Sequence, residues 1–268
     1  MSDYVLALSD GEVERYQMMA EHAQDTEAAQ WSTVGIREGA TVADIGCGPG
    51  AMSTLVARLV GPGGRVWAVD QEPEAVATAT ALAAKLGLEN VHCQVGDATA
   101  TGLDAASVDV VMMRHVLAHN GGREQAIVDH LATLLRPGGC LYLVDVDGRA
   151  MRTRPPMPDL EDLSDRYWGF QAGRGNDVAV GLRLGELVTE AGLELVEHRG
   201  WYDIFVAPPG LRPPSWAARD AMVAAGHATQ ADVDRWSAAF ERIDEGQVTW
   251  TLFIALFSAI GAAPTERS

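Results

Sequence analysis

A glycine-rich segment at residues 42–51, VADIGCGPGA, carries the strongest chemical signal in this sequence. Residues 42–45 are typical of the end of a buried strand, and apolar residues recur at helical spacing over 51–60. A strand that turns through glycines into a helix lets a ligand approach the backbone closely. The turn also points the positive end of the helix at that ligand, so we predict a nucleotide-type site here.

A carboxylate follows the second predicted strand at the place where a nucleotide would need it. Asp70 comes about 20 residues after the turn and can accept hydrogen bonds from two ribose hydroxyls. Gly46, Gly48 and Ala51 satisfy the spacing G-x-G-x-x-G/A of dinucleotide-binding proteins. By itself this spacing does not distinguish NAD from another adenosine ligand.

Three further features favour a ligand other than NAD. Asp44 places an anion beside the turn, where it suits an ammonium group and repels a pyrophosphate. Asp97 and the amide of Ala98 suit the amino group and the ring nitrogen of adenine. The segment RPGG at 136–139 ends a helix just before a strand. Together these features predict an adenosine ligand that also carries an amine.

Alternating strands and helices must position these groups. Helices separate most of the strands that we expect, which lie at 41–45, 65–69, 91–95, 108–113, 141–146, 193–206 and 248–260. This alternation predicts an α/β fold with a mostly parallel sheet and right-handed crossovers. A strand, an insertion and a final strand at the end of the chain predict that the last strand is antiparallel.

Helical segments before and after this alternation predict caps over the site. A helix over 9–31 precedes the first strand, and insertions follow the fifth and sixth strands. We therefore expect an N-terminal helical cap at 1–40 and a main domain at 41–268. Within the main domain, residues 41–147 form the cofactor-binding half. The insertions at about 151–181 and 207–245 form an acceptor cap.

Composition and charge limit the classes of partner. The 268 residues carry a formal net charge of -17, which repels nucleic acid. Cys47, Cys93 and Cys140 lack the spacing of a zinc site or of a disulfide framework, so no metal is expected. No signal peptide is visible, and the longest apolar run is shorter than the about 20 residues of a membrane helix. We expect a cytoplasmic protein, monomeric or homodimeric, without a membrane partner.

With these motifs the sequence resembles the class I S-adenosylmethionine-dependent methyltransferases, in the branch of small-molecule and quinone-type enzymes. The resemblance covers roughly residues 41–147. It rests on VADIGCGPG at 42–50, AVDQ at 68–71, GDA at 96–98, DVVMMRHVLAH at 109–119 and LLRPGG at 134–139. It implies a Rossmann-like fold with a seven-stranded, mostly parallel sheet, helices on both faces and helical cap insertions.

The resemblance also implies roles for individual residues toward S-adenosylmethionine. Gly46, Cys47, Gly48 and Gly50 would line its methionine part, with Asp44 near the amino group. Asp70 and Gln71 would hold the ribose, and Asp97 and Ala98 the adenine. Arg114 and His115 would pass close to the sulfonium, Arg114 through its backbone, and Tyr16 of the first helix is a candidate for capping the glycine turn.

The candidates for acceptor chemistry come from the later strands and the insertions. His115 and His119, with ordinary pKa values of about 6.5, are the candidate general bases. Asp145 lies where ligands of open α/β sheets bind and could contact the acceptor. Tyr167, Trp168 and Arg174 could wall a pocket, although aromatic residues in insertions also build the insertion's own core.

The sequence therefore predicts methyl transfer from S-adenosylmethionine to a small organic acceptor, a secondary metabolite or a quinone-like ring. Methylation of a protein or peptide is the alternative within the family. From other classes, an NAD(P)-dependent oxidoreductase and a non-catalytic cofactor-binding protein stay open.

Overall fold

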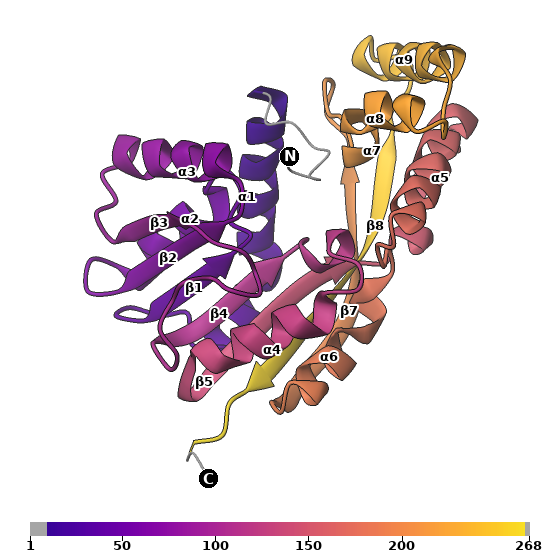
Figure 1. Cartoon of the computed structure of the whole chain (residues 1–268). Helices are drawn as coiled ribbons and strands as arrows, with labels where there is room; N and C mark the ends of the chain where they lie inside the picture. The colour runs from indigo at the N-terminus through magenta and orange to yellow at the C-terminus, as the bar shows by residue number, and fades with distance from the viewer. Residues whose placement is uncertain (1–9, 266–268) are drawn as a thin grey trace.

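One twisted sheet runs through residues 10–265, the part of the chain that the computed structural model describes (Figure 1). The predicted N-terminal cap before residue 10 lies outside these residues. Within them, the sheet has eight strands: β1 (Thr41–Ile45), β2 (Arg65–Asp70), β3 (Val91–Val95), β4 (Val108–Arg114), β5 (Leu135–Val146), β6 (Arg152–Arg154), β7 (Glu194–Val206) and β8 (Thr251–Ala262).

The strand order confirms the predicted α/β architecture. The order is β3-β2-β1-β4-β5-β8-β6, with β7 also paired to β8. Strands β1 to β5 are parallel, whereas β8 runs antiparallel to its partners β5, β6 and β7. The antiparallel last strand was predicted, and the three-residue β6 was not. A strand of that length is too short to give an alternating pattern.

Helices occupy the positions between strands that the periodicity predicts. They are α1 (Asp10–Thr33), α2 (Ala51–Val60), α3 (Pro73–Lys85), α4 (Glu124–Leu134), α5 (Pro158–Gly173), α6 (Leu184–Glu190), α7 (Pro214–Ala217), α8 (Arg219–Ala224) and α9 (Gln230–Asp244). Short 3-10 turns are η1 (Leu117–His119), η2 (Gly148–Ala150) and η3 (Val180–Arg183). None of the described helices is both long and apolar enough to cross a membrane.

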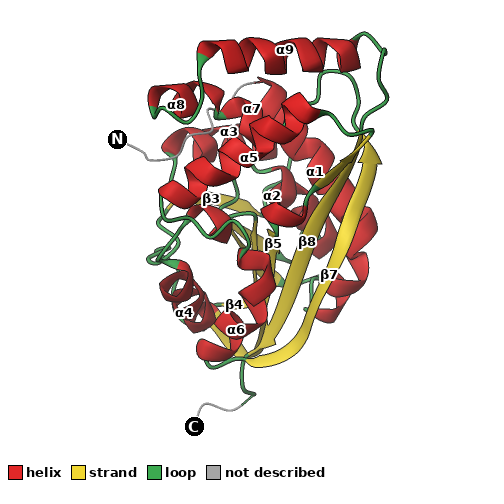
Figure 2. Cartoon of the chain, turned by 90° about the vertical axis from the view of Figure 1, so that its right-hand side faces the viewer, coloured by secondary structure: helices red, strands yellow, loops and turns green. Residues whose placement is uncertain are grey.

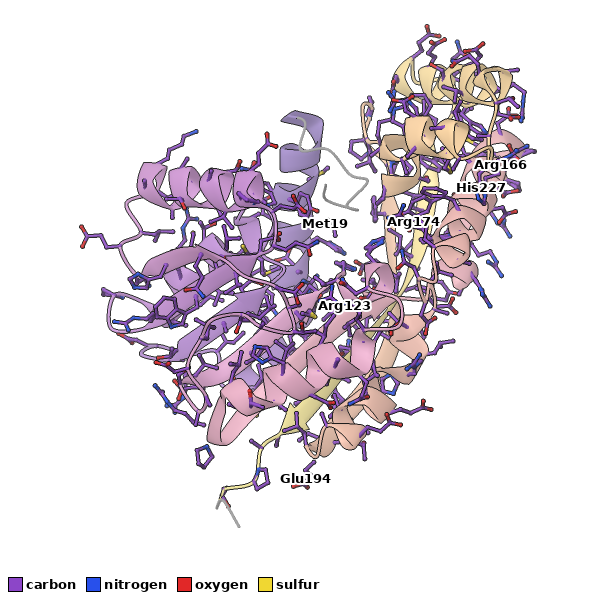
Figure 3. The ribbon with its side chains drawn as sticks, viewed as in Figure 1. Met19, Arg123, Arg166, Arg174, Glu194 and His227 are labelled. Atoms are coloured by element: carbon purple, nitrogen blue, oxygen red, sulfur yellow. The ribbon has the colours of Figure 1, made fainter. Side chains whose placement is uncertain are left out.

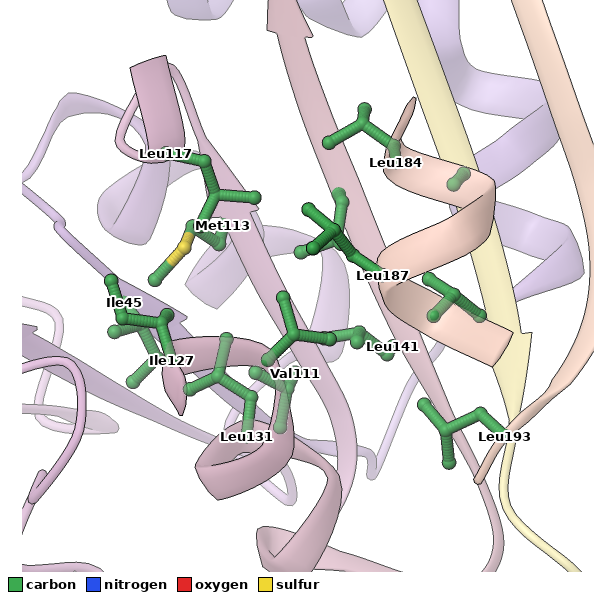
Figure 4. Packing of buried hydrophobic residues seen from close by; sticks show 14 of the residues in the cluster. Ile45, Val111, Met113, Leu117, Ile127, Leu131, Leu141, Leu184, Leu187 and Leu193 are labelled. Carbon is green, nitrogen blue, oxygen red and sulfur yellow. The ribbon is translucent and has the colours of Figure 1, made fainter. Parts of the chain in front are cut away.

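Two hydrophobic cores sandwich the sheet because successive side chains of a strand face opposite sides. In β4, Val110 and Met112 face the core under α1 and α2, whereas Val111 and Met113 face the core under α4 and α6. Figure 4 shows this second core, in which Leu131 and Leu187 from the two helices approach the strand residues. The central strands are thus fixed from both faces, and their carboxyl ends are held in place.

A third core belongs to the insertions. Helices α5, α7, α8 and α9 pack on the outer halves of β7 and β8, and we call these four helices the helical cap (Figure 2). Trp236 and Phe240 of α9 are fully buried in this core. The Trp236 indole donates to Asp162 of α5 at 3.1 Å, which ties the two insertions together. The two predicted insertions therefore form one structural unit.

Candidate cofactor and acceptor site

The glycine turn at the end of β1 is a cradle in which side chains would not fit. Gly46, Gly48 and Gly50 adopt φ values of 75°, 53° and 85°, in the left-handed region that favours glycine. A Cβ atom at Gly46 would lie 2.3 Å from Cγ2 of Val116, and one at Gly50 would lie 2.7 Å from Cβ of Ala79. The turn leads directly into the N-terminus of α2, whose first backbone amides lack partners within the helix. The amides of the turn itself are bonded within the protein, those of Gly46 and Cys47 to the carbonyl of Val69.

Tyr16 of α1 lies over this turn. A Cβ atom at Gly48 would be 3.6 Å from Cε1 of the Tyr16 ring, which is van der Waals distance. Helix α1 therefore reaches the glycine turn, while the role of Tyr16 in capping a ligand stays a prediction. Cys47, inside the turn, is buried, and burial raises the pKa of its thiol well above its usual value. This thiol stays protonated and contributes packing rather than a nucleophile.

Asp70 closes the turn from the end of β2. Its Oδ2 accepts a hydrogen bond from the amide of Gly48 at 2.8 Å, and its Oδ1 accepts one from the amide of Glu72 at 3.0 Å. Burial raises the pKa of Asp70, although the two hydrogen bonds act to lower it. Gln71, the next residue, is exposed. The Asp70 carboxylate is therefore held beside the glycine turn by the amide of Gly48, next to the predicted ligand site.

Asp44 is a buried acid on β1, the strand that pairs with β2. Its side chain is 3% exposed, and Ser53 of α2 donates to its Oδ2 at 2.5 Å. Burial raises the pKa of Asp44 to about 6, and the Ser53 hydrogen bond and the positive charge of Arg114 limit the increase. A carboxylate with so little solvent around it favours any cation that arrives beside the turn.

Asp97 follows β3, next to Asp70. The amide of Gly96 donates to the carbonyl of Asp70 at 3.0 Å, which ties the ends of β2 and β3 together. Partial burial acts to raise the pKa of Asp97, but hydrogen bonds from Arg123 and Thr99 outweigh it and lower the pKa to about 2. Ala98 packs against the core under α4 and α6. The structure thus brings Asp44, Asp70 and Asp97 to one edge of the sheet, while their contacts with a ligand stay predictions.

His115 and His119 lie at the same edge, just after β4. His115 adopts φ 57°, a left-handed conformation that is uncommon for residues other than glycine and turns the chain sharply out of the strand. Its amide donates to the carbonyl of Val144 at 2.9 Å. His119 ends η1, and both imidazoles are half-buried. The candidate bases are therefore near the glycine turn, because β4 pairs with β1.

Asp145 and Tyr167, two of the candidates for acceptor contact, are both buried. Asp145 is 1% exposed, and its carboxylate accepts from the amides of Ala118 and Val146 at 3.2 and 2.8 Å. Burial raises its pKa to about 6. The hydrogen bond from Ala118 ties the Asp145 carboxylate to η1, and its contact with an acceptor stays a prediction. Tyr167 is also 1% exposed and belongs to the core of the helical cap.

Trp168 and Arg174 lie nearer to the predicted acceptor region. A Cβ atom at Gly148 would be 2.7 Å from Cζ2 of Trp168, so the indole covers η2 after β5. Arg174 is exposed beyond the end of α5, with its guanidinium 5.6 Å from the ring centroid of Phe170. In Figure 3, Arg174 and Met19 of α1 border the space between the helical cap and the sheet.

The loop that contains Gly121 contacts the loop that contains Gly175 and Asn176, and we call this contact the latch. It joins the end of the helical cap to the edge of the sheet that carries the predicted cofactor residues. Local sequence patterns did not predict it. The amide of Gly121 donates to Oδ1 of Asn176 at 3.0 Å. A Cβ atom at Gly121 would lie 1.8 Å from the carbonyl oxygen of Gly175, so the two loops are in backbone contact. Arg123, two residues along, binds Asp97 at 2.5 Å. No local pattern marks these residues, because their partners are distant in the chain.

Among the described residues, no group of three or more His, Cys, Asp or Glu side chains is arranged to hold a metal ion. The three cysteines are free thiols.

Comparisons with known proteins agree on the type of domain. An arsenite methyltransferase from Halobacterium salinarum is 33% identical over 161 residues, which are 59% of this chain and 38% of that relative. Nocamycin O-methyltransferase from Saccharothrix syringae is 35% identical over 127 residues, 47% of this chain and 42% of the relative. The chain thus spans less than half the length of these curated relatives.

A solved structure shows the same fold along nearly the whole chain. A SAM-dependent methyltransferase from Aquifex aeolicus superposes with a TM-score of 0.52 at 17% identity, covering 93% of this chain and 99% of that one. The family model described as a methyltransferase domain matches residues 36–179, more than half of the 268. The chain therefore belongs to the methyltransferase domain family, and its resemblance to the class I S-adenosylmethionine-dependent methyltransferases is confirmed.

Proposed function

We propose that this protein transfers a methyl group from S-adenosylmethionine to a small organic acceptor bound between α1, the loop after β4 and the helical cap. One observation carries the proposal: a glycine cradle without room for side chains is flanked by three carboxylates at adjacent strand ends. Each carboxylate matches one part of an adenosine ligand that carries an amine.

The residues present fit this cofactor. The left-handed turn of Gly46, Gly48 and Gly50 keeps side chains away from the backbone at the end of β1, where the cofactor would lie. Asp44 would hold the ammonium group, since it is the buried anion of the site. Asp70 would hold the ribose hydroxyls and Asp97 the amino group of adenine. A pyrophosphate in the cradle would instead face Asp44 and Asp70, so the fit to NAD is poor.

The bound cofactor would supply a methyl group on a positively charged sulfur. An acceptor aligned opposite the sulfur would bond to the methyl carbon as the carbon–sulfur bond breaks, with S-adenosylhomocysteine as the leaving group. The protein contributes mainly alignment, which can be worth up to about 7–11 kcal/mol. An acceptor that must lose a proton also needs a base, and His115 is the candidate because its left-handed turn holds the side chain at the end of β4. His119 is a second candidate on η1.

The acceptor is organic rather than arsenite. Trivalent arsenic is a soft centre that prefers thiolates, and the burial of Cys47 keeps its thiol protonated. The described residues also offer no cluster of three cysteine, histidine or acidic side chains. The O-methyltransferase among the relatives supports an oxygen acceptor, and Trp168 and Arg174 are candidates to contact it.

Calorimetry with S-adenosylhomocysteine and, separately, NADH tests the ligand assignment. We expect S-adenosylhomocysteine to bind and NADH to show no heat of binding at the same concentrations. Binding of NADH without binding of S-adenosylhomocysteine would end the methyltransferase assignment. A screen of phenols, hydroxyquinones and peptides with isotopically labelled S-adenosylmethionine then separates a small organic acceptor from a peptide.

A further inference from the structure

We propose that Glu27 of α1 is a positioning residue for the cofactor: it pairs with Arg114 and thereby leaves the negative charge of Asp44 to be balanced by an ammonium group. This inference rests on the proposed function, because it concerns the same cofactor. Its new content is that an acid on the N-terminal helix, outside the glycine turn and the strand ends, sets the charge of the site.

The geometry places Glu27 in a buried polar network. Glu27 is 1% exposed, and its Oε2 accepts hydrogen bonds from Arg114 and from the hydroxyl of Tyr142, the latter at 2.8 Å. Burial raises the pKa of Tyr142, so its hydroxyl remains a donor. The positive charge of Arg199 on β7 acts to lower the pKa of Tyr142. The Arg199 guanidinium itself lies over the Trp201 ring, 4.9 Å from the ring centroid.

The sheet register explains why Arg114 can serve two acids. Asp44 on β1 pairs with Met112 on β4, so Arg114, two residues further along, faces the same side of the sheet as Met112. That side is the one covered by α1 and α2. Arg114 therefore lies between Glu27 on the helix above and Asp44 on the neighbouring strand, and its positive charge acts on both.

The buried network carries more negative than positive charge. Glu27 and Asp44 are two acids, and Arg114 is the cation that acts on both. Asp70 adds a further negative charge near Asp44. With Glu27 in place, the guanidinium is neutralised from the helix side, and one negative charge stays beside the glycine turn. The ammonium group of the cofactor's amino-acid part is the cation that completes this network.

Removing the charge of Glu27 should therefore weaken binding of the amino-acid part alone. In E27Q, Arg114 has only Asp44 to neutralise, so the site loses its uncompensated negative charge. We expect the affinity for S-adenosylhomocysteine to fall on the order of tenfold, because one poorly screened charge is lost. The affinity for 5′-methylthioadenosine, which has the adenosine part but no ammonium group, should change less than twofold.

Isothermal titration of both ligands into wild type, E27Q and D25N makes the comparison. Asp25 is an exposed acid on the same helix, so D25N removes the same charge where water screens it. D25N should bind both ligands like wild type. If E27Q does not fold, E27M replaces it, since an apolar side chain of similar volume needs no hydrogen-bond partner and Arg114 keeps Asp44.

The pair of ligands separates the possible outcomes. Selective loss of S-adenosylhomocysteine affinity supports the inference. Equal loss for both ligands would mean that Glu27 only supports the structure of α1, and unchanged binding of both would mean that it does not influence the site; either result overturns the inference. A wild-type protein that binds neither ligand would overturn the cofactor assignment itself, irrespective of Glu27.

Discussion

The substitution D44N should make the protein more stable at neutral pH while it impairs the site. The asparagine side chain would keep the shape of the aspartate and an oxygen that accepts from Ser53. Arg114 would keep Glu27 as its partner. What the substitution removes is a negative charge that the folded protein holds almost entirely out of water.

The size of the effect follows from the pKa of Asp44, which burial raises from 3.8 to about 6. Between these two values the folded state binds more protons than the unfolded state, so stability falls as the pH rises through this window. Above pH 6 the full cost is present, about 3 kcal/mol at 1.36 kcal/mol per pKa unit. The free energy of unfolding of D44N should therefore exceed that of wild type by up to about 3 kcal/mol at pH 7.5 and by only about 1 kcal/mol at pH 4.5.

Reversible urea unfolding of wild type and D44N at both pH values measures this difference. D25N, which removes an exposed acid from α1, is the control and should change the free energy of unfolding by less than about 0.5 kcal/mol. Calorimetry should show that D44N binds S-adenosylhomocysteine at least about tenfold more weakly, since the partner of the ammonium group is lost. A variant that is no more stable than wild type at pH 7.5, or whose gain is the same at pH 4.5, would refute the reasoning.

Three further substitutions test other parts of the site. D70A removes the acceptor of the Gly48 amide and should weaken S-adenosylhomocysteine binding at least about tenfold; unchanged affinity in calorimetry would remove Asp70 from the site. H115A should lower methyl transfer to an accepted substrate more than it lowers cofactor affinity, and wild-type turnover would exclude His115 as the base. G121A forces the loop away from Gly175 and should destabilise the protein by about 1–3 kcal/mol in urea unfolding. G169A, at an exposed α5 position with no atom within 4 Å of the added Cβ, is its control, and equal effects of the two would contradict the latch.

Local patterns predicted the sheet and its ligand edge well because the signals lie within a few residues of each other. Helices separate β1 from β2, β2 from β3 and β4 from β5, and the predicted glycine turn and its neighbouring acids stand at the strand ends. The carboxyl ends of parallel strands meet at one edge, so an acid directly after each strand is placed by topology alone.

Orientation of the side chains just beyond those ends was less predictable. Asp145 follows the same rule as Asp70, yet its carboxylate turns inward to the amide of Ala118. Tyr167 has the composition of a pocket residue but belongs to the core that α5 shares with α9. In both cases the partners of the side chain come from segments distant in the chain, so local sequence does not decide its orientation.

The sequence by itself determined the order of strands and helices, the glycine turn and the positions of the acids along the chain. Only the tertiary structure decided which charges meet: Glu27 reaches Arg114 across 87 positions of the chain, and the loop of Gly121 meets that of Asn176 across 55. The reason is physical. Periodicity fixes which face a residue presents, whereas the partner on that face depends on strand register and helix packing, which form only when the whole sheet assembles.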